Sequence, residues 1–390
     1  MNPSSSGWIK KLLKSIILDD ITSKLSETEF YNALKSCGFI YGNNIKIVHA
    51  LIEKNDFTDE EKSKTNLFIA LYYTHKSITP NIDFINSIID FYTEINATKK
   101  SFFQEILNEK KSSRQLEKII HKRVQIDDNF LTKNFNYFVI NALLFVDILA
   151  YQEYLYKKQI SKTYIKNLEA TIETIVLNVL SSKTNRTKYD ESLIKLFEAS
   201  LRYQDNFDIT YNEAIQYLKT NQEKQYVLDI ACMATWSDKT IEINEQHFLQ
   251  KLSSDLKLDK TTQKRSIQMV NHFYTVYKDN IALLSSKNII KSFYDNSNKM
   301  VRVLISRNRK RLYNELIDSK ELMILLSKST VRDLTKEEQK KVQEQLLDIF
   351  KSIPSLAIFL LPGGALLLPI FIKFIPKLLP SAFDDNRIEE

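Results

Sequence analysis

Two acidic segments with matching sequences are the first residues in the chain whose types could do chemistry. Residues 206–213 align with residues 238–245, so the second segment repeats the pattern of the first. Carboxylate oxygens at short spacing are ligands that calcium and similar cations prefer. The same spacing is also typical of a helix start, where a glutamate bonds back to the N-cap backbone. The candidate metal ligands are Asp205, Asp208, Glu213, Asp238 and Glu245.

The second acidic segment resembles the loop of the tellurite-resistance TerB-like helical domains. Asp238, Ile241 and Glu245 fit the pattern D-G-x-I-x-x-x-E of that family. The resemblance implies a metal-holding acidic loop within residues 188–260. Lys239 stands in place of the glycine, however, and its charge beside the lead carboxylate opposes a cation. We therefore expect helix capping here, by Asp238 or Thr240 with Glu245, and no metal or other cofactor.

The densest positive charge lies in residues 301–312, which contain no acid. Such a cluster suits phosphates, either of RNA or of an anionic lipid surface. The candidate contact residues are Arg302, Arg307, Arg309, Lys310 and Arg311.

No recognisable catalytic motif occurs in the chain. It has no Walker loop, no G-x-S-x-G elbow and no HExxH pair among its five histidines. Adjacent acids such as Asp127 and Asp128 diverge by about 100° on a helix and do not converge on one substrate. Cys37 and Cys232 are lone thiols without zinc-ligand spacing. We predict a protein that is not an enzyme.

The elements that position these residues should all be helices. Only five of 390 residues are glycine, and none occurs between Gly42 and Gly363. Sheet proteins of this size need many tight turns that use glycine and proline. Five of the seven prolines lie in residues 354–380. The fold class is therefore all-α, a multi-helix soluble body with a proline-broken C-terminal membrane segment.

Capping boxes predict where three helices begin. Ser26 with Glu29, Thr58 with Glu61, and Thr335 with Glu338 place helix starts near 27, 59 and 336. An apolar run within residues 130–157 predicts a central core helix, because its uncharged part is too short to span a membrane. The polar residues 181–188 break the periodicity. We expect an N-terminal helix (1–25), a helical domain (26–181), a TerB-like repeat domain (188–290) and a C-terminal module (300–390).

The N-terminal helix has two interpretations. Its apolar residues recur at helical spacing and are interrupted by three lysines, without the continuous apolar run of an export signal. An amphipathic helix with a basic flank rests on anionic lipid, with Trp8 at the headgroup level. The same pattern also fits a first helix packed on the domain. The sequence leaves both open.

Residues 352–372 contain no charged side chain, and the length of this run matches that of a bilayer crossing. Pro362, Gly363 and Gly364 should break a helix near its midpoint, so a kinked span and a re-entrant hairpin both remain, with the span favoured. We expect residues 353–379 in the membrane, with Lys373, Lys377, Phe371, Phe374 and Phe383 at its interfaces. The residues that define this segment are Pro354, Pro362, Gly363, Gly364, Pro369, Pro376 and Pro380.

The C-terminal sequence resembles the leucine-zipper/EF-hand-containing transmembrane (Letm-type) family. The shared pattern consists of L-T-x-x-E at Leu334 to Glu338, an Ile-Pro pair, two prolines seven apart, and K-x-x-P-x-x-L-P-S-x-F ending at Phe383. The remainder of the chain looks like bacterial Letm-related proteins described as biofilm-associated. The resemblance implies a membrane protein linked to potassium or calcium exchange for protons, or to ribosome binding. Ala365 stands where the family usually has an intramembrane acid, so an exchange mechanism lacks its titratable group.

These observations predict a non-enzymatic, membrane-attached helical protein of Letm type, with a role in ribosome binding or ion homeostasis. A cation/proton antiporter and a TerB-like metal-binding, stress-sensing module are the alternatives. We expect membrane lipid and ribosomes as partners, and no DNA. Homo-oligomerisation is compatible with the sequence. The expected location is the bacterial inner membrane with the body in the cytoplasm.

Overall fold

The computed structural model supports the helical fold class. It describes residues 2–19, 25–49, 57–96, 104–107, 110–124, 142–161, 163–183, 190–191, 194, 209–236, 242–278, 298, 300–353, 356, 359–360 and 367–378. Within these ranges the regular structure is entirely helical and no strand occurs. The all-α prediction is therefore confirmed for the described part of the chain.

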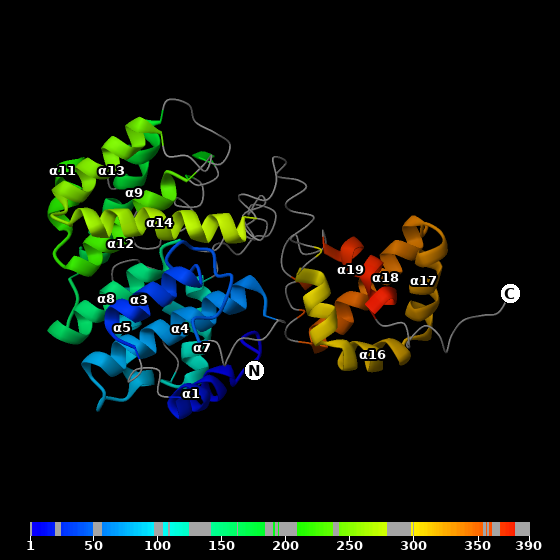
Figure 1. Ribbon diagram of the computed structural model, residues 1–390. Helices are drawn as coiled ribbons and strands as arrows, with labels where there is room; N and C mark the ends of the chain where they lie inside the picture. The colour runs from blue at the N-terminus through cyan, green and yellow to red at the C-terminus, as the bar shows by residue number, and fades with distance from the viewer. Residues whose placement is uncertain are drawn as a thin grey trace.

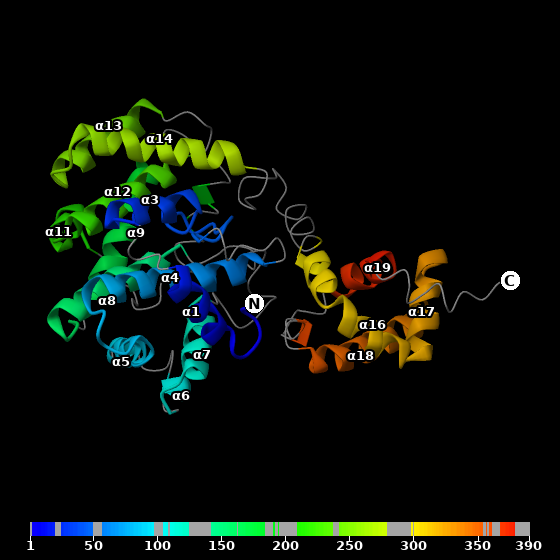
Figure 2. The same ribbon diagram turned by 60° about the horizontal axis from the view of Figure 1, so that its bottom comes forward.

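The helices fall into two groups, which we call the body (residues 2–278) and the C-terminal module (residues 298–378). The body helices are α1 (Trp8–Asp19), α3 (Glu27–Ser36), α4 (Asp59–Ile78), α5 (Phe84–Asn96), α6 (Gln104–Leu107), α7 (Ser113–Val124), α8 (Leu144–Lys157), α9 (Tyr164–Ser182), α11 (Tyr211–Tyr217), α12 (Asn221–Ala234), α13 (Ile243–Asp255) and α14 (Lys260–Tyr277). The module helices are α16 (Arg309–Ile317), α17 (Lys320–Val331), α18 (Lys336–Ser352) and α19 (Leu368–Leu378). Figures 1 and 2 show α16 to α19 as a separate group beside the body.

The three predicted capping boxes are present, and each starts the helix that the sequence indicated. Helices α3, α4 and α18 begin directly after Ser26, Thr58 and Thr335. In each case the glutamate at the third helical position accepts from the N-cap backbone amide. Two donors that have no partner inside the helix are thereby satisfied at each start.

Helix α4 lies at the centre of the body. Almost every side chain from Glu61 to His75 is buried, whichever way it points from the helix axis. A helix that is buried all round must be covered by neighbours on several sides. Helix α8 lies against it (Figures 1 and 2), with residues from Leu144 to Tyr151 buried. The predicted core helix within residues 130–157 is thus confirmed where it is described, although α4 is the more enclosed of the two.

The first helix packs on the body. Trp8, Ile9, Leu12 and Ile16 are buried, and the Trp8 ring meets the ring of Phe68 edge-on at 5.7 Å between centroids. These are the apolar positions whose helical spacing left two interpretations open. In this structure their apolar face is covered by protein, including α7.

One hydrophobic core connects the predicted domains 26–181 and 188–290. The cluster runs from Trp8 to Tyr274 without a division at residues 181–188. Helix α9, which precedes that stretch, packs against α11, α12 and α13, which follow it. A break in hydrophobic periodicity marks the end of a helix, but it does not show which helices later share a core.

Gly38 allows the turn that follows α3. Its φ of +88° lies in the left-handed region, where a side chain would be strained. A Cβ atom at this position would also lie 1.9 Å from the carbonyl oxygen of Asn43. The turn brings Phe39, Ile40 and Tyr41 into the core. This glycine therefore has a structural role that no other residue fills without a backbone shift.

The C-terminal module has a hydrophobic core of its own, formed by residues from Val301 to Ile375. At its centre the rings of Phe350, Phe359 and Phe371 lie within 4.5 to 5.1 Å of one another, centroid to centroid. Val301 is the first buried residue of this core in the described part of the chain. Residues before and after Pro362, such as Ile353 and Leu367, are buried in the core of the module.

Candidate functional site

The basic stretch 301–312 has three different environments in the structure. Residues 300–307 are helical, Asn308 interrupts the helix, and α16 begins at Arg309. Arg302 lies over the ring of Phe374, with its guanidinium carbon 4.3 Å from the ring centroid. It is therefore held by a cation–π contact within the module.

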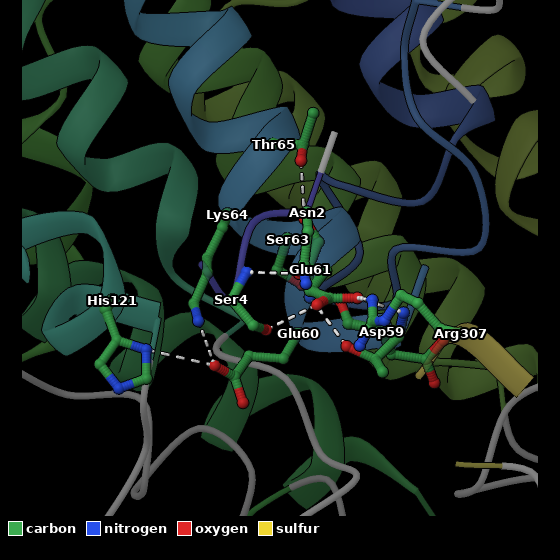
Figure 3. Close-up of polar contacts among 11 residues, drawn as sticks. Asn2, Ser4, Asp59, Glu60, Glu61, Ser63, Lys64, Thr65, His121 and Arg307 are labelled. Atoms are coloured by element: carbon green, nitrogen blue, oxygen red, sulfur yellow. Dashed lines mark hydrogen bonds and ion pairs between the residues drawn. The ribbon is translucent and has the colours of Figure 1, made fainter. Parts of the chain in front are cut away.

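Arg307 connects the module to the body. Its Nη1 donates to Oε2 of Glu61 at 2.5 Å, across 246 residues of sequence (Figure 3). The side chain of Glu61 is fully buried and that of Arg307 is 9% exposed. A charge-assisted contact with so little solvent access is stronger than a surface ion pair.

Glu61 receives hydrogen bonds from three separate parts of the chain. Besides Arg307, the hydroxyl of Ser4 donates to Oε1 at 2.5 Å, and the amide of Thr58 donates to Oε2 at 2.9 Å. The same carboxylate therefore closes the capping box of α4, holds the N-terminal segment and contacts the module (Figure 3). We call Ser4, Glu61 and Arg307 the polar junction.

A second carboxylate lies next to the polar junction. Glu60 accepts from Lys64 and lies 3.3 Å from Nδ1 of His121 (Figure 3). Burial alone would raise the pKa of Glu60, but the charges of Lys64 and His121 lower it far below the ordinary value. Glu60 is therefore ionised at neutral pH. The first turn of α4 carries negative charge where the helix dipole favours it.

The remaining basic residues, Arg309, Lys310 and Arg311, lie at the start of α16 and are exposed. We call them the basic triplet. The first turn of α16 contains no acid, and no described residue forms an ion pair with the triplet. The helix dipole adds positive potential at the same end. Of the five predicted contact residues, these three are the ones that face solvent without a partner in the described part of the chain.

The described glutamates of the two acidic segments cap helices. Glu213 accepts from the amide of Thr210 at 2.8 Å, and Glu245 accepts from the amide of Glu242 at 2.8 Å. Both caps therefore lie at equivalent positions of the two acidic segments. The N-cap of the second copy is Glu242, rather than the expected Asp238 or Thr240. Asp205, Asp208, Asp238 and Thr240 lie outside the described residues.

A lysine supplies the positive charge beside Glu245. Nζ of Lys183 lies 2.5 Å from Asp190 and 3.3 Å from Glu245, and all three side chains are at most 1% exposed. Burial raises the pKa of Glu245, and the amide of Glu242 and Lys183 oppose that shift. Among the described residues, no group of three or more His, Cys, Asp or Glu side chains is placed to hold a metal. The arrangement here is a buried ion-pair cluster.

The proline-rich segment is described only in part. Pro354, Pro362, Gly363, Gly364 and Pro380 lie outside the described residues, as do Ala365 and Phe383. Pro369 and Pro376 belong to α19, which has 11 residues. None of the described helices combines the length and the apolar character that a membrane crossing requires.

The described side chains of this segment lie in the module core. Phe371 and Phe374, the expected aromatic anchors of a membrane interface, are both buried there in this structure. The reason is amphipathicity, since α19 directs one apolar face at α17 while Lys373 stays exposed.

Sequence reasoning missed the contacts that join distant segments. Glu61 was identified as a capping residue, and its bond to Arg307 was not anticipated. Lys183 lay in a polar stretch interpreted as a boundary, but it is buried between two acids. An unpaired charge near a helix end is too common to indicate its partner 246 residues away.

One family of known proteins matches the end of the chain. Residues 334–390 match the family described as "LETM1-like, RBD". This region begins at Leu334, so the L-T-x-x-E pattern corresponds to the capping box that starts α18. No solved structure matches the chain.

Two curated relatives match a short part of the chain. Over 55 residues the chain is 43% identical to "Mitochondrial proton/calcium exchanger protein" of Drosophila melanogaster. This alignment covers 14% of this chain and 5% of the fly protein. Over 58 residues the chain is 38% identical to "LETM1 domain-containing protein mdm28, mitochondrial" of Schizosaccharomyces pombe. This alignment covers 15% of this chain and 12% of the yeast protein. The chain thus spans a small fraction of these relatives, and its C-terminal segment is similar to Letm-type proteins.

Proposed function

We propose that this chain is a non-enzymatic Letm-type protein that attaches ribosomes to a membrane through its C-terminal module. The observation that carries the proposal is the match of residues 334–390 to the LETM1-like RBD family, directly after an exposed basic triplet. Its place would be the bacterial inner membrane, with the body in the cytoplasm.

The basic triplet has the chemistry that ribosomal RNA requires. Phosphates carry the charge of RNA, and arginine can donate to a phosphate through two parallel N–H groups. Arg309 and Arg311 flank Lys310 at a helix start, where backbone amides add positive potential. Arg307 is nearly buried against Glu61 and the exposed Arg302 already lies over the ring of Phe374, so the triplet is the part of the basic stretch without a contact in the described residues.

Co-sedimentation with purified ribosomes tests this role. We expect the variant Arg309→Ala/Lys310→Ala/Arg311→Ala to bind about tenfold more weakly or worse, and to lose part of the salt dependence of binding. The matched control is Lys260→Ala/Lys264→Ala/Arg265→Ala, which removes three exposed cations from the first turns of α14 in the body. Equal binding by both variants would contradict the proposal.

Membrane attachment rests on residues 353–379. The uncharged run 352–372 is the observation in its favour, since a single charge would oppose insertion. Flotation of the full-length protein with vesicles of anionic lipid, followed by a wash at high salt, tests it. An inserted protein stays with the vesicles and needs detergent for release. Complete release by salt alone would mean electrostatic binding at the surface and would reject insertion.

A cation/proton antiporter is the second candidate, because the fly relative is named as a proton/calcium exchanger. Ala365 argues against it, since the uncharged run offers no group that could carry a proton through the membrane. Reconstituted vesicles with an internal pH indicator distinguish the two functions. We expect no proton flux on addition of calcium or potassium, and cation-dependent flux would favour the antiporter.

A further inference from the structure

The body contains a cavity that the proposed function does not use. It lies among α3, α4 and α8 and has a volume of about 170 Å³. An engineered protein cavity of ~150 Å³ holds one benzene molecule, so this space suits a ligand of similar size. Its mouth is marked by Glu27 and by Tyr156, whose side chain is 65% exposed.

Five of the thirteen described lining residues are aromatic, namely Phe30, Tyr31, Tyr73, Phe145 and Tyr156. The rings of Phe30 and Tyr73 stack at 3.9 Å, and those of Tyr31 and Phe145 meet edge-on at 5.3 Å between centroids. The face of an aromatic ring is negative and attracts cations. Tyr31 already does so, since Nζ of Lys35 lies 5.5 Å from its ring centroid.

Four of the five hydroxyl groups of the described lining, all except that of the exposed Tyr156, have already used their hydrogens. Tyr31 donates to Asp229, and Tyr73 donates to the carbonyl of Leu25. Thr74 and Ser77 donate to carbonyls of their own helix, those of Ala70 and Tyr73. These groups can therefore offer a ligand only acceptor oxygens.

Two further acceptors belong to the same cavity. Oε1 of Gln222 is buried and has no hydrogen-bond partner among the described residues. A buried acceptor in this state favours a ligand that donates a hydrogen bond. Glu27 supplies the only formal charge of the described lining, which contains no Lys, Arg or His.

We propose that this cavity binds a small organic cation, an alkylated ammonium group, between the aromatic walls and the carboxylate of Glu27. The aromatic faces attract the positive charge, no residue of the described lining is itself a cation, and the volume admits a group of this size. A neutral apolar ligand would gain binding free energy only from contact with the aromatic walls.

Calorimetry on the full-length protein separates these cases. The probes are choline and 3,3-dimethylbutan-1-ol, which has the same shape with carbon in place of the charged nitrogen. We expect choline to bind about tenfold more tightly than the alcohol, because only the cation gains from the rings and the carboxylate. Equal binding of the two probes, or binding of neither, would overturn the proposal.

Variants locate the binding. Glu27 is exposed, so Glu27→Gln should leave the fold unchanged and weaken choline binding by about three- to tenfold, with little effect on the alcohol. The control is Glu153→Gln, which removes a carboxylate of α8 that pairs with Lys157 and does not line the cavity. Nuclear Overhauser contacts from the choline methyl protons to the rings of Phe30 and Phe145 should accompany binding. Equal effects of the two variants, or methyl contacts elsewhere, would reject this site.

Discussion

The body and the C-terminal module differ in how deeply their ion pairs are buried. The interior of the body contains the ion pairs Lys35–Asp229, Arg123–Asp147 and Lys183–Asp190, whose side chains are at most 1% exposed. In the described part of the module, the ion pairs formed between its own residues lie at the surface. Arg332 and Glu338 are 46% and 19% exposed, and Lys341 and Glu321 are 60% and 55% exposed.

This difference suggests separate tasks. A buried ion pair loses hydration on both sides, so it contributes little net stability but penalises any arrangement in which its partners do not meet. The body is therefore held to one packing of its helices. The module relies on an apolar core, and the cations of its basic triplet remain at the surface.

The largest expected effect comes from breaking a buried pair in the body. Asp229 accepts from Nζ of Lys35 at 3.0 Å and from the hydroxyl of Tyr31 at 2.9 Å. Asp229→Ala should lower the free energy of unfolding by about 3–5 kcal/mol, because it leaves the ammonium of Lys35 buried and unpaired. Denaturant titration followed by circular dichroism measures this.

The control for that prediction is a surface pair of the module. Asp348→Ala removes the partner of Lys351, and the two side chains are 73% and 66% exposed. A change of about 0.5 kcal/mol or less is expected. If the two variants had similar effects, the contrast between buried and surface charge would not hold.

An intermediate effect is expected at the polar junction, where the two regions meet. Arg307→Met should lower stability by about 1–3 kcal/mol, because the buried carboxylate of Glu61 loses a charged donor. The module should then melt separately from the body in scanning calorimetry. Arg311→Met, an exposed arginine of the same stretch, serves as the control. Identical traces for both variants and the wild type would show that the junction does not couple the regions.

The smallest effect is a local change of pKa in the module. Hydrogen bonds from Arg332 and from the amide of Thr335 lower the pKa of Glu338 from 4.5 to about 2. A lowered carboxyl pKa adds stability above pH 4.5 that is lost as the pH falls toward 2. Arg332→Met should raise the pKa of Glu338, observed by NMR titration of its side-chain carboxyl. Lys336→Met, which does not contact this carboxyl among the described contacts, should change it less.

Several local features could be predicted from the sequence. The helix starts after Ser26, Thr58 and Thr335 depend on pairs three residues apart, so a short window contains both partners. The match between the two acidic segments extends to the helix starts that follow them, capped at Thr210 and Glu242, although the sequence had indicated Asp238 or Thr240 as the second N-cap. The start of the module was visible because the densest group of cations begins near residue 300.

The candidate site was predictable only in part. All five cations of the basic stretch looked equivalent in sequence, but Arg302 stacks on Phe374 and Arg307 reaches Glu61. Phe371 and Phe374 looked like membrane anchors, because an apolar side chain suits lipid and a protein core equally well. The cavity at α3, α4 and α8 could not be predicted from the sequence, because the residues that line it come from separate helices.

The sequence by itself determined that this chain is helical, where several helices begin, and that its C-terminal segment is similar to Letm-type proteins. These properties follow from residue types and from spacings of a few positions, which act through the nearest turn of backbone. Only the tertiary structure decided that the body shares one core, that Lys183 is buried between Asp190 and Glu245, and that Arg307 joins the two regions. Each of these depends on which helices pack together, and that choice reflects the sum of many weak apolar contacts that no single spacing encodes.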